Sequence, residues 1–306
     1  MIEDLPLLLG GFLAAAVRVA TPLLLAATGE TIAERSGVIN LGLEGMMLAG
    51  ALAATLGATA SGPWTGVLWA VLAGIALALV FAAVAIGARA NQIITGTAIT
   101  LAAIGLTATV YRQAFGVGGA GLDLQTLPAI PVPGLASIPV VGEALFRQPA
   151  PTYFALLVLP LAWWFLFRTR VGLALRATGE AGATAHASGV PTRAIRVLAI
   201  LIGGAFGGLA GATLVLAQVG TFAERMTAGR GFVAIAIVVL GRWHPGGVAI
   251  AALLFGAATA LQYLFQSVGV DLPYQLFLML PYVLVLLALA GLVGRVRPPA
   301  ELGSDV

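Results

Sequence analysis

The chain of 306 residues contains no cysteine, and all of its basic residues other than histidine are arginine. Without cysteine there can be no disulfide bond, no thiolate metal site and no cysteine nucleophile. Without lysine, neither a Walker A phosphate-binding loop nor Schiff-base chemistry on a lysine can be built. The chain is therefore not a P-loop ATPase, and any energy drawn from ATP must be supplied by another chain.

Charged residues of both signs are scarce. They make up 9% of the chain, while 60% of it is hydrophobic; a soluble domain averages roughly 25% charged residues. So few charges cannot cover a water-facing surface, and most of the exterior must therefore face lipid. The pI of about 9.8 reflects dispersed arginines and a net charge of only +3, which the positive-inside rule explains without nucleic-acid binding.

Long apolar runs predict an all-α, polytopic bundle of membrane helices. A bilayer crossing needs roughly 20 apolar residues, and the runs between polar clusters give about nine spans (roughly 8–10). We expect a single transmembrane domain over residues 1–306, with an N-terminus that is an uncleaved first span because it lacks a basic region. The expected spans are 5–28, 41–59, 65–88, 92–115, 153–167, 194–219, 231–241, 246–268 and 274–293.

The distribution of arginine predicts how the chain is oriented in the membrane. The densest basic stretch covers residues 168–196, and the tail after the last expected span begins with Arg295 and Arg297. The positive-inside rule places both regions in the cytoplasm. Counting the expected spans backwards then puts the N-terminus outside and the C-terminus in the cytoplasm.

A polar stretch over residues 34–50 interrupts the apolar pattern near the second span. Glu34 and Arg35 can pair with other groups at the membrane edge, and Gly37 permits a break in the helix. Asn40 and Glu44 are four residues apart, which predicts one shared helix face. Polar groups in a membrane usually face a partner or a cavity. Two interpretations follow: hydrogen bonds that hold neighbouring helices together, or contact of Asn40 and Glu44 with a transported solute.

A second polar segment, residues 176–191, lies inside the basic stretch and is too polar to span a membrane. We expect a short helix over residues 181–187, with Glu180 near its start and Gly189 and Pro191 as stop signals. A short helix of small residues that projects from a loop suits docking into a groove on another protein, and a solvated loop is the alternative. His186 has no cluster of ligands around it, so we expect no metal site.

The third polar segment covers residues 218–245. A short apolar stretch between two glycine-rich polar clusters predicts a discontinuous or tilted helix, which often lines the binding cavity of a transporter. Phe222 and Phe232 can stack on a ring, and Gln218 and Arg230 can form hydrogen bonds with hydroxyl groups. Aromatic packing and interfacial anchoring by arginine are the alternative interpretation.

Two repeated patterns bear on helix packing and symmetry. Gly203, Gly207 and Gly211 recur at every fourth position with Gly204 and Gly208 alongside, which predicts a face of small residues where helices approach closely. The dipeptide Glu-Arg at residues 34–35 recurs at residues 224–225, and the expected topology places the two copies on opposite sides of the membrane. That arrangement is typical of an inverted repeat.

Together these segments resemble the permease subunits of bacterial ABC importers in the branched-chain amino acid, simple-sugar and nucleoside group. The run from Glu34 to Gly50 looks like the most recognisable stretch of the nucleoside and sugar members. The runs Gly229-Arg-Gly-Phe232 and Gly241-Arg-Trp-His-Pro245 resemble the shorter of two paired nucleoside permeases. The resemblance covers residues 18–295.

The resemblance implies a multi-pass permease of the bacterial inner membrane that imports nucleosides or related simple sugars. It implies three kinds of partner: a second homologous permease in a heterodimer, a cytoplasmic ABC ATPase, and an extracytoplasmic substrate-binding protein. The permease itself would bind no cofactor, and the ATPase would use ATP and magnesium.

The resemblance also places a coupling helix, which docks on the ATPase, within the loop 168–196. The stretch that begins at Arg176 and ends at Val190 matches the position of that helix and is expected to contact the ATPase. Within it, the family pattern of a glycine, a polar residue, an alanine and a glycine is matched by Gly179, Glu180, Ala183 and Gly189. Ala181-Gly182 stands where the family usually has Asn-Pro.

The main alternative is a secondary transporter or channel for a small polar solute. Such proteins more often carry acidic residues for ion coupling in their central spans. In this sequence the middles of the expected spans are almost free of charge, apart from Arg18 and Glu44. An intramembrane enzyme would need a nucleophile, a metal cluster or paired aspartates around a cavity, and the sequence provides no such set.

Overall fold

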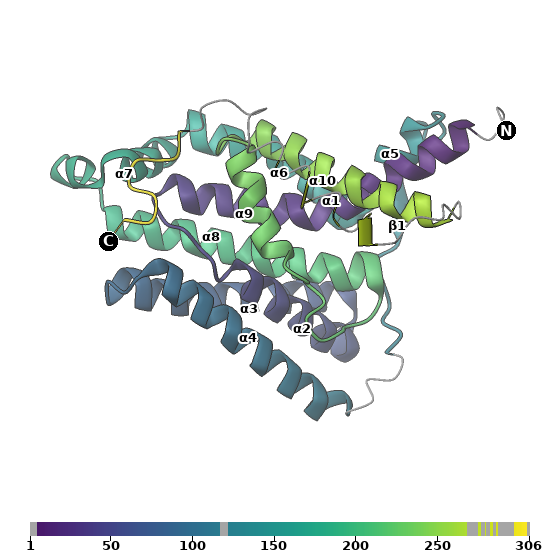
Figure 1. Ribbon diagram of the computed structural model, residues 1–306, viewed down its shortest axis with the longest axis horizontal. Coiled ribbons are helices and arrows are strands. Elements are labelled where there is room, and N and C mark those ends of the chain that lie inside the picture. The colour runs from purple at the N-terminus through teal and green to yellow at the C-terminus, as the bar shows by residue number, and fades with distance from the viewer. Residues whose placement is uncertain are drawn as a thin grey trace.

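The computed structural model describes residues 5–116, 122–267 and 297–304, together with six positions between 275 and 286. It is an elongated bundle of helices, in which the start of α1 and the segment 297–304 lie at opposite ends (Figure 1). The described residues contain two strands of three residues each, β1 (Ala129–Pro131) and β2 (Arg147–Pro149), which pair antiparallel. All other regular structure described is helical, which confirms the predicted fold class.

The helices follow one another along the chain with short connections. They are α1 (Leu5–Arg35), α2 (Leu43–Ser61), α3 (Pro63–Phe81) with its π-helical continuation η1 (Ala82–Gly87), α4 (Gln92–Phe115), α5 (Val141–Phe146), α6 (Ala150–Arg168), α7 (Arg170–Ala187), α8 (Thr192–Thr213) with its π-helical continuation η2 (Leu214–Val219), α9 (Arg230–Leu240) and α10 (Pro245–Ser267).

Seven of the described helices are long and apolar enough to cross a membrane. The prediction of about nine spans is therefore too high for the described chain. The expected span 231–241 is α9, whose 11 residues reach only about 16 Å, about half of the hydrocarbon core of a bilayer. The expected span 274–293 lies outside the continuously described residues.

The first helix is longer than the apolar pattern predicts. We expected a span over residues 5–28 followed by a polar loop, whereas α1 continues to Arg35. The hydroxyl groups of Thr28 and Thr31 donate to the carbonyl oxygens of Leu24 and Ala27, at 2.6 and 2.7 Å. A hydroxyl that bonds back to its own helix needs no water, and the polar stretch can therefore stay helical inside the bundle.

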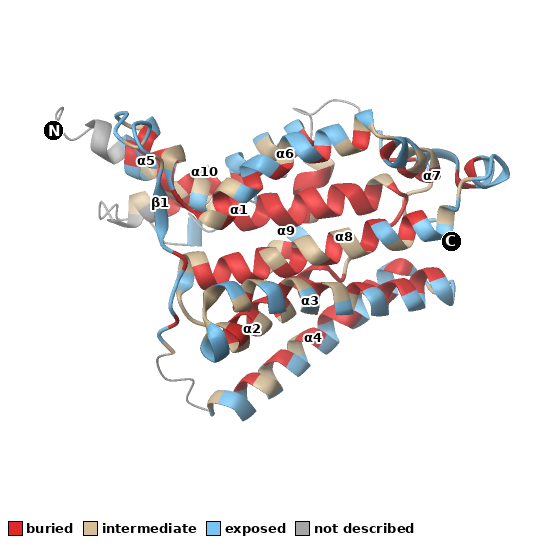
Figure 2. Cartoon of the chain, turned by 180° about the vertical axis from the view of Figure 1, so that it is seen from behind, coloured by how far each residue is buried: buried red, intermediate tan, exposed pale blue. Residues whose placement is uncertain are grey.

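The bundle has buried central helices and outer helices with apolar exposed faces. α8 lies between α1 on one side and α2 and α3 on the other (Figure 1). Much of α1, α2 and α8 is buried, whereas α3, α4 and α6 are largely exposed along one face (Figure 2). The exposed side chains on these outer helices are large and apolar, for example Trp64, Leu101 and Leu157. An apolar exterior of this kind suits lipid, not water.

Glycines let α8 approach its neighbours at backbone distance, which confirms the predicted small-residue face. A Cβ atom added to Gly208 would overlap the carbonyl oxygen of Ala70 in α3. A Cβ atom added to Gly211 would overlap the carbonyl oxygen of Met47 in α2. Association of helices in lipid depends on such close van der Waals packing because lipid removes the hydrophobic drive between helices.

We predict that Gly208→Leu lowers the free energy of unfolding by at least about 1–3 kcal/mol, because the added side chain forces α3 and α8 apart. Gly105→Leu is the matched control, since nothing lies within 4 Å of a Cβ atom built at Gly105. Thermal unfolding in detergent measures both. Equal midpoints for the two variants would show that the contact between α3 and α8 is not tightly packed.

Candidate functional site

The connection between α1 and α2 is a compact polar turn. Its chain reverses at Gly37, whose φ of 91° is favourable only for glycine. Asn40 is fully buried; its backbone N–H donates to Glu30 Oε1 at 3.0 Å, and its side-chain Oδ1 accepts from the backbone N–H of Gly42 at 3.1 Å. Asn40 therefore stands before α2 begins, and the prediction that it shares a helix face with Glu44 is wrong, because its side chain forms a local turn.

The carboxylate of Glu44 joins α2 to the start of α9. One oxygen accepts from Thr227 Oγ1 at 2.6 Å and from the backbone N–H of Gly229 at 2.8 Å. The other accepts from the backbone N–H of Gly231 at 2.6 Å. Glu44 is only 6% exposed. The carboxylate is therefore occupied by donors of this chain, which is the arrangement expected when a polar group holds neighbouring helices together.

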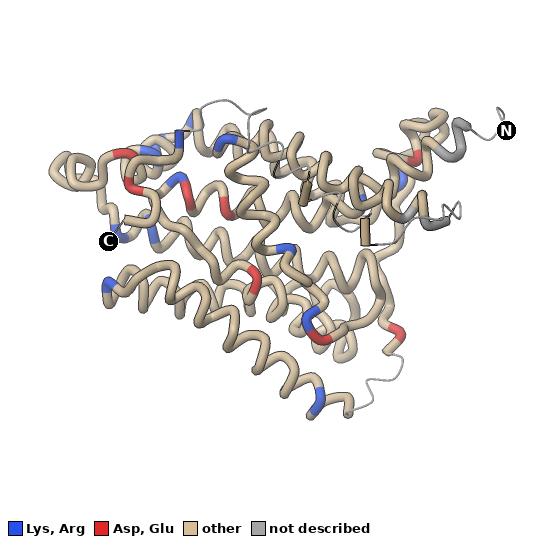
Figure 3. Tube along the Cα trace, in the orientation of Figure 1, with Lys and Arg blue, Asp and Glu red and all other residues tan. Residues whose placement is uncertain are grey.

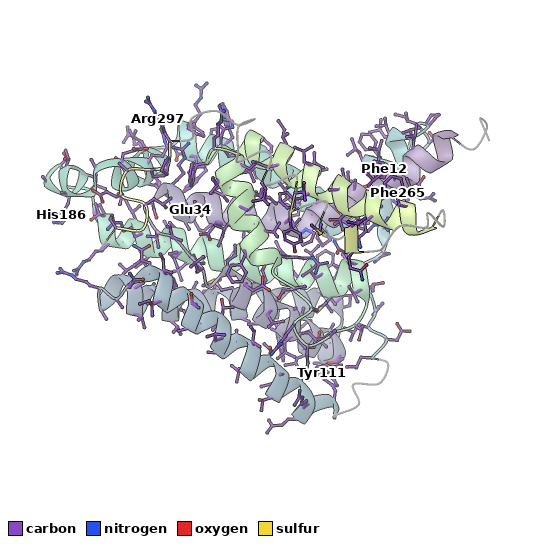
Figure 4. The ribbon with its side chains drawn as sticks, viewed as in Figure 1. Phe12, Glu34, Tyr111, His186, Phe265 and Arg297 are labelled. Carbon is purple, nitrogen blue, oxygen red and sulfur yellow. The ribbon has the colours of Figure 1, made fainter. Side chains whose placement is uncertain are left out.

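The end of α1 is tied to the turn between α9 and α10. Glu34 is 2% exposed, and its carboxylate accepts from the indole N–H of Trp243. Arg35 donates from Nε to the carbonyl oxygen of Trp243 at 2.9 Å, and its guanidinium lies 5.9 Å from the ring centroid of Phe167 in α6. Both members of the Glu-Arg dipeptide therefore contact the same turn, and Figure 4 shows Glu34 inside the bundle.

Glu30 is a buried carboxylate that the sequence analysis did not single out. It is 0% exposed, and Oε2 has no hydrogen-bond partner among the described residues. It lies one helical turn before Glu34, and the four-residue spacing of the two acids in a polar stretch was the signal that could have found it. Trp243 was missed as well, because its partner Glu34 lies 209 residues away in the sequence.

The segment after α8 is discontinuous, as its glycine-rich flanks predicted. The helix turns π-helical at η2, ends at Gly220 and resumes as α9 at Arg230. Figure 1 shows α9 running across the long helices instead of along them. A helix interrupted in this way leaves backbone groups that the surrounding protein must satisfy, and Glu44 does so here.

The four residues that we expected along this segment differ in exposure. Phe222 is 3% exposed, and its ring centroid lies 4.8 Å from that of Tyr111. Phe232 is 46% exposed. Gln218 is half-buried and donates to the carbonyl oxygen of Arg18 at 2.6 Å, and Arg230 donates to the carbonyl oxygen of Met226 at 2.8 Å. Phe222 thus packs in the core, and Phe232 is the most accessible of the four.

The two Glu-Arg dipeptides lie near opposite ends of α4. Residues 34–35 lie near its start, where Gln92 accepts from the backbone N–H of Ile39 at 2.9 Å. Glu224 accepts two hydrogen bonds from Arg112 in the last turn of α4, at 2.7 and 2.9 Å. The Arg112 guanidinium holds the pKa of the exposed Glu224 carboxyl below its usual value. The inverted repeat itself stays a prediction.

Helix α7 contains the expected short helix. Ala181 has non-helical angles (φ −156°, ψ 71°), which separate a helical segment up to Glu180 from a second one ending at Ala187. Glu180, Ala183 and Gly189 are exposed, whereas Gly179 is buried. A Cβ atom added to Gly179 would overlap the carbonyl oxygen of Arg35. The buried face of α7 therefore rests on the end of α1, and its other face is open.

Arg176 anchors α7 from within. Its Nε donates to the carbonyl oxygen of Leu166 at 3.0 Å, and its guanidinium lies 4.9 Å from the ring centroid of Phe167. Arginine positions gather at this end of the bundle (Figure 3), and His186 lies at its outer tip (Figure 4). An open cavity of about 620 Å³ beside α7 is lined by Arg89, His186, Pro191, Thr192, Arg193, Ala194 and Arg196.

The family described as "Branched-chain amino acid transport system / permease component" matches residues 12–289 of this chain. The chain belongs to this permease family. It is 43% identical over 86% of its length, and 80% of the relative, to a putative glucose ABC transporter permease (TsgC13) of Haloferax volcanii. It is 37% identical over 93% of its length, and 92% of the relative, to the guanosine ABC transporter permease NupQ of Bacillus subtilis.

A third relative is the nucleoside ABC transporter permease NupC of Lactococcus lactis, at 33% identity over 93% of both chains. No solved structure matches. Membership makes this permease a multi-pass membrane component of an ABC transporter, which works with an ATPase and a substrate-binding protein. It also decides against the secondary transporter or channel as the class of this protein.

We predict that Glu44→Leu destabilises the permease, because each donor left without an acceptor in the buried junction costs about 1–3 kcal/mol. Thr227→Val is the matched control, since it removes only one donor and leaves Glu44 bonded to Gly229 and Gly231. Thermal unfolding in detergent should rank wild type above Thr227→Val and Thr227→Val above Glu44→Leu. A Glu44→Leu variant as stable as Thr227→Val would contradict the role of the carboxylate at this junction.

We further predict that two aromatic truncations in the same segment have different effects. Phe222→Ala should cost about 3–5 kcal/mol of unfolding free energy because it removes a buried ring. Phe232→Ala should stay within about 0.5 kcal/mol of wild type because its ring is exposed. Unfolding midpoints in detergent measure both, and equal losses of stability would mean that Phe232 is also part of the core.

Proposed function

We propose that this permease is one of two homologous subunits, in a heterodimer, that form the membrane pathway of an ATP-driven importer for nucleosides or related simple sugars. The observation that carries the proposal is the similarity over 93% of the chain to permeases named for guanosine and for nucleosides. The similarity to a putative glucose permease is the reason to retain sugars as candidates.

The proposed pathway lies beside the discontinuous segment 218–245. Phe232 is the accessible ring there, with Gln218 and Arg230 half-buried beside the break, and an exposed ring can stack on a nucleobase or a sugar face. Glu44 supports this wall from behind through its hydrogen bonds to the start of α9, Phe222 packs on Tyr111, and Asn40 holds the turn that precedes α2. In this proposal the accessible groups meet the solute, and the buried ones hold the surrounding helices and turns in place.

In this proposal the ATPase drives transport by docking at the end of the bundle that carries α7. The exposed surface around its second segment is the docking surface for the ATPase, which uses ATP and magnesium. It includes Ala183 within the segment, Glu180 just before the kink and Gly189 just after the helix ends. In this proposal the membrane is a bacterial inner membrane, the α7 end lies in the cytoplasm and the N-terminus lies outside; the arginines that gather at the α7 end support this orientation through the positive-inside rule. An extracytoplasmic binding protein delivers the solute at the opposite end.

We predict that Ala183→Trp uncouples ATP hydrolysis from uptake in the assembled transporter, because a large ring on the docking face prevents close contact with the ATPase. Glu180→Arg should act in the same direction. Gly189 is a poorer test, since its φ of 87° strains any other residue. The measurement is uptake and ATPase activity in proteoliposomes, with Gly105→Leu as the control far from the docking face.

The amount of solute taken up per ATP hydrolysed should fall by about tenfold in the Ala183→Trp variant. This change corresponds to about 1.4 kcal/mol of lost coupling free energy. Wild-type uptake per ATP in both Ala183→Trp and Glu180→Arg would contradict the docking surface. The substrate class is tested by measuring uptake of labelled guanosine in the presence of unlabelled nucleosides or glucose. If neither nucleosides nor glucose reduced this uptake, the proposed substrate class would be refuted.

A further inference from the structure

The described C-terminal segment, residues 297–304, crosses the surface formed by four other elements. The backbone N–H of Glu301 donates to the carbonyl oxygen of Gly179 in α7 at 2.9 Å. The backbone N–H of Gly303 donates to the carbonyl oxygen of Gly37, in the turn after α1, at 3.1 Å. Gln92, the first residue of α4, donates to the carbonyl oxygen of Ser304 at 2.8 Å. The segment is thus bonded to other elements at Glu301, Gly303 and Ser304.

The side chain of Glu301 adds two charge-assisted contacts. Oε1 accepts from the backbone N–H of Gly182 at 2.6 Å, and Oε2 accepts from Arg196 Nη2, in α8, at 2.7 Å. The Arg196 side chain is 7% exposed and also donates to the carbonyl oxygen of Ser36 at 3.3 Å. A pair with one nearly buried member, held by further hydrogen bonds, is stronger and more directional than an exposed pair.

The contact between Glu301 and Gly182 lies at the start of a helical segment. Gly182 is the first residue after the kink at Ala181, where the helical segment 182–187 begins and its backbone N–H has no carbonyl partner within the helix. A Cβ atom added to Gly182 would lie 2.5 Å from Glu301 Oε2 and 3.2 Å from Arg196 Nη2. Glycine is therefore required for the carboxylate to approach the backbone this closely.

We propose that Glu301 is a positioning residue for energy coupling. Its carboxylate fixes the helical segment 182–187 to Arg196 of α8, while its own backbone ties the same point to Gly179 and, through Gly303, to the turn at Gly37. When the ATPase displaces α7 through its exposed face, α8 and the junction of α1 and α2 then move together with α7. The inference rests on the proposed docking of α7 on the ATPase and identifies what transmits that contact.

The test uses the complete transporter in proteoliposomes and compares Glu301→Ala and Glu301→Gln with wild type. Glu301→Ala should retain ATPase activity and lose about fivefold or more in uptake per ATP, the range of a typical coupling energy. Glu301→Gln should lose less, because its amide oxygen still accepts from Gly182. Glu143→Ala is the matched control, since Glu143 is an exposed acid on α5.

A spectroscopic measurement separates positioning from general destabilisation. This chain has no cysteine, and His186→Cys therefore provides one nitroxide site on the segment 182–187 in a transporter whose partner subunits are also cysteine-free. Glu301→Ala should increase the mobility of that label, whereas Glu143→Ala should leave it unchanged. Glu301→Ala should lower the unfolding midpoint, because Arg196 and the N–H of Gly182 lose an acceptor, but it should leave a folded transporter with ATPase activity.

Wild-type uptake per ATP in Glu301→Ala would overturn the inference, whether or not the label becomes more mobile. Parallel loss of ATPase activity and uptake with a lowered unfolding midpoint would also overturn it, because Glu301 would then be needed only for folding. If Ala183→Trp has no effect on coupling while Glu301→Ala still mobilises the label, the docking of α7 fails and the local fixation by Glu301 stands.

Discussion

The carboxylate of Glu44 satisfies the backbone at the point where two helices begin in the middle of an apolar bundle. In lipid no water is available for a free N–H group, and each must find its acceptor within the protein. Glu44 lies in the first turn of α2 and accepts from Gly229 and Gly231 at the start of α9. Without such an acceptor the break between η2 and α9 could not exist at this depth, and α9 could not cross the bundle at its steep angle.

Glycines allow the backbones of neighbouring segments to approach each other closely. The turn at Gly37 fits under α7 only because Gly179 lacks a side chain, and α8 meets α2 and α3 only because Gly208 and Gly211 lack one. Close backbone approach leaves little freedom for one helix to slide alone. Packed interfaces of this kind have discrete arrangements, so that helices in contact tend to move together as rigid bodies. The glycine contacts thus favour a transporter whose parts rearrange as units.

Most of the architecture could be predicted from sequence wherever local signals decide it. The expected span 92–115 coincides with α4, because Asn91 caps its start by accepting from the backbone N–H of Ile94, and Gly116 ends it. The errors occur where tertiary contacts override a local pattern. Residues 29–35 look like a loop but are helical inside the bundle, and the role of Trp243 depends on a glutamate 209 residues away.

The same contacts bear on which component recognises the solute. The polar side chains near the break that could bind hydroxyl groups each already form at least one hydrogen bond within this chain; they are Asn40, Glu44, Gln218 and Arg230. Discriminating one polar solute from another requires polar groups that are unpaired until the correct ligand arrives. The described residues near the break offer an exposed ring at Phe232, which stacks with little chemical discrimination. Selectivity in the proposed system is therefore better supplied by the binding protein, and the permease needs only to admit what that protein releases.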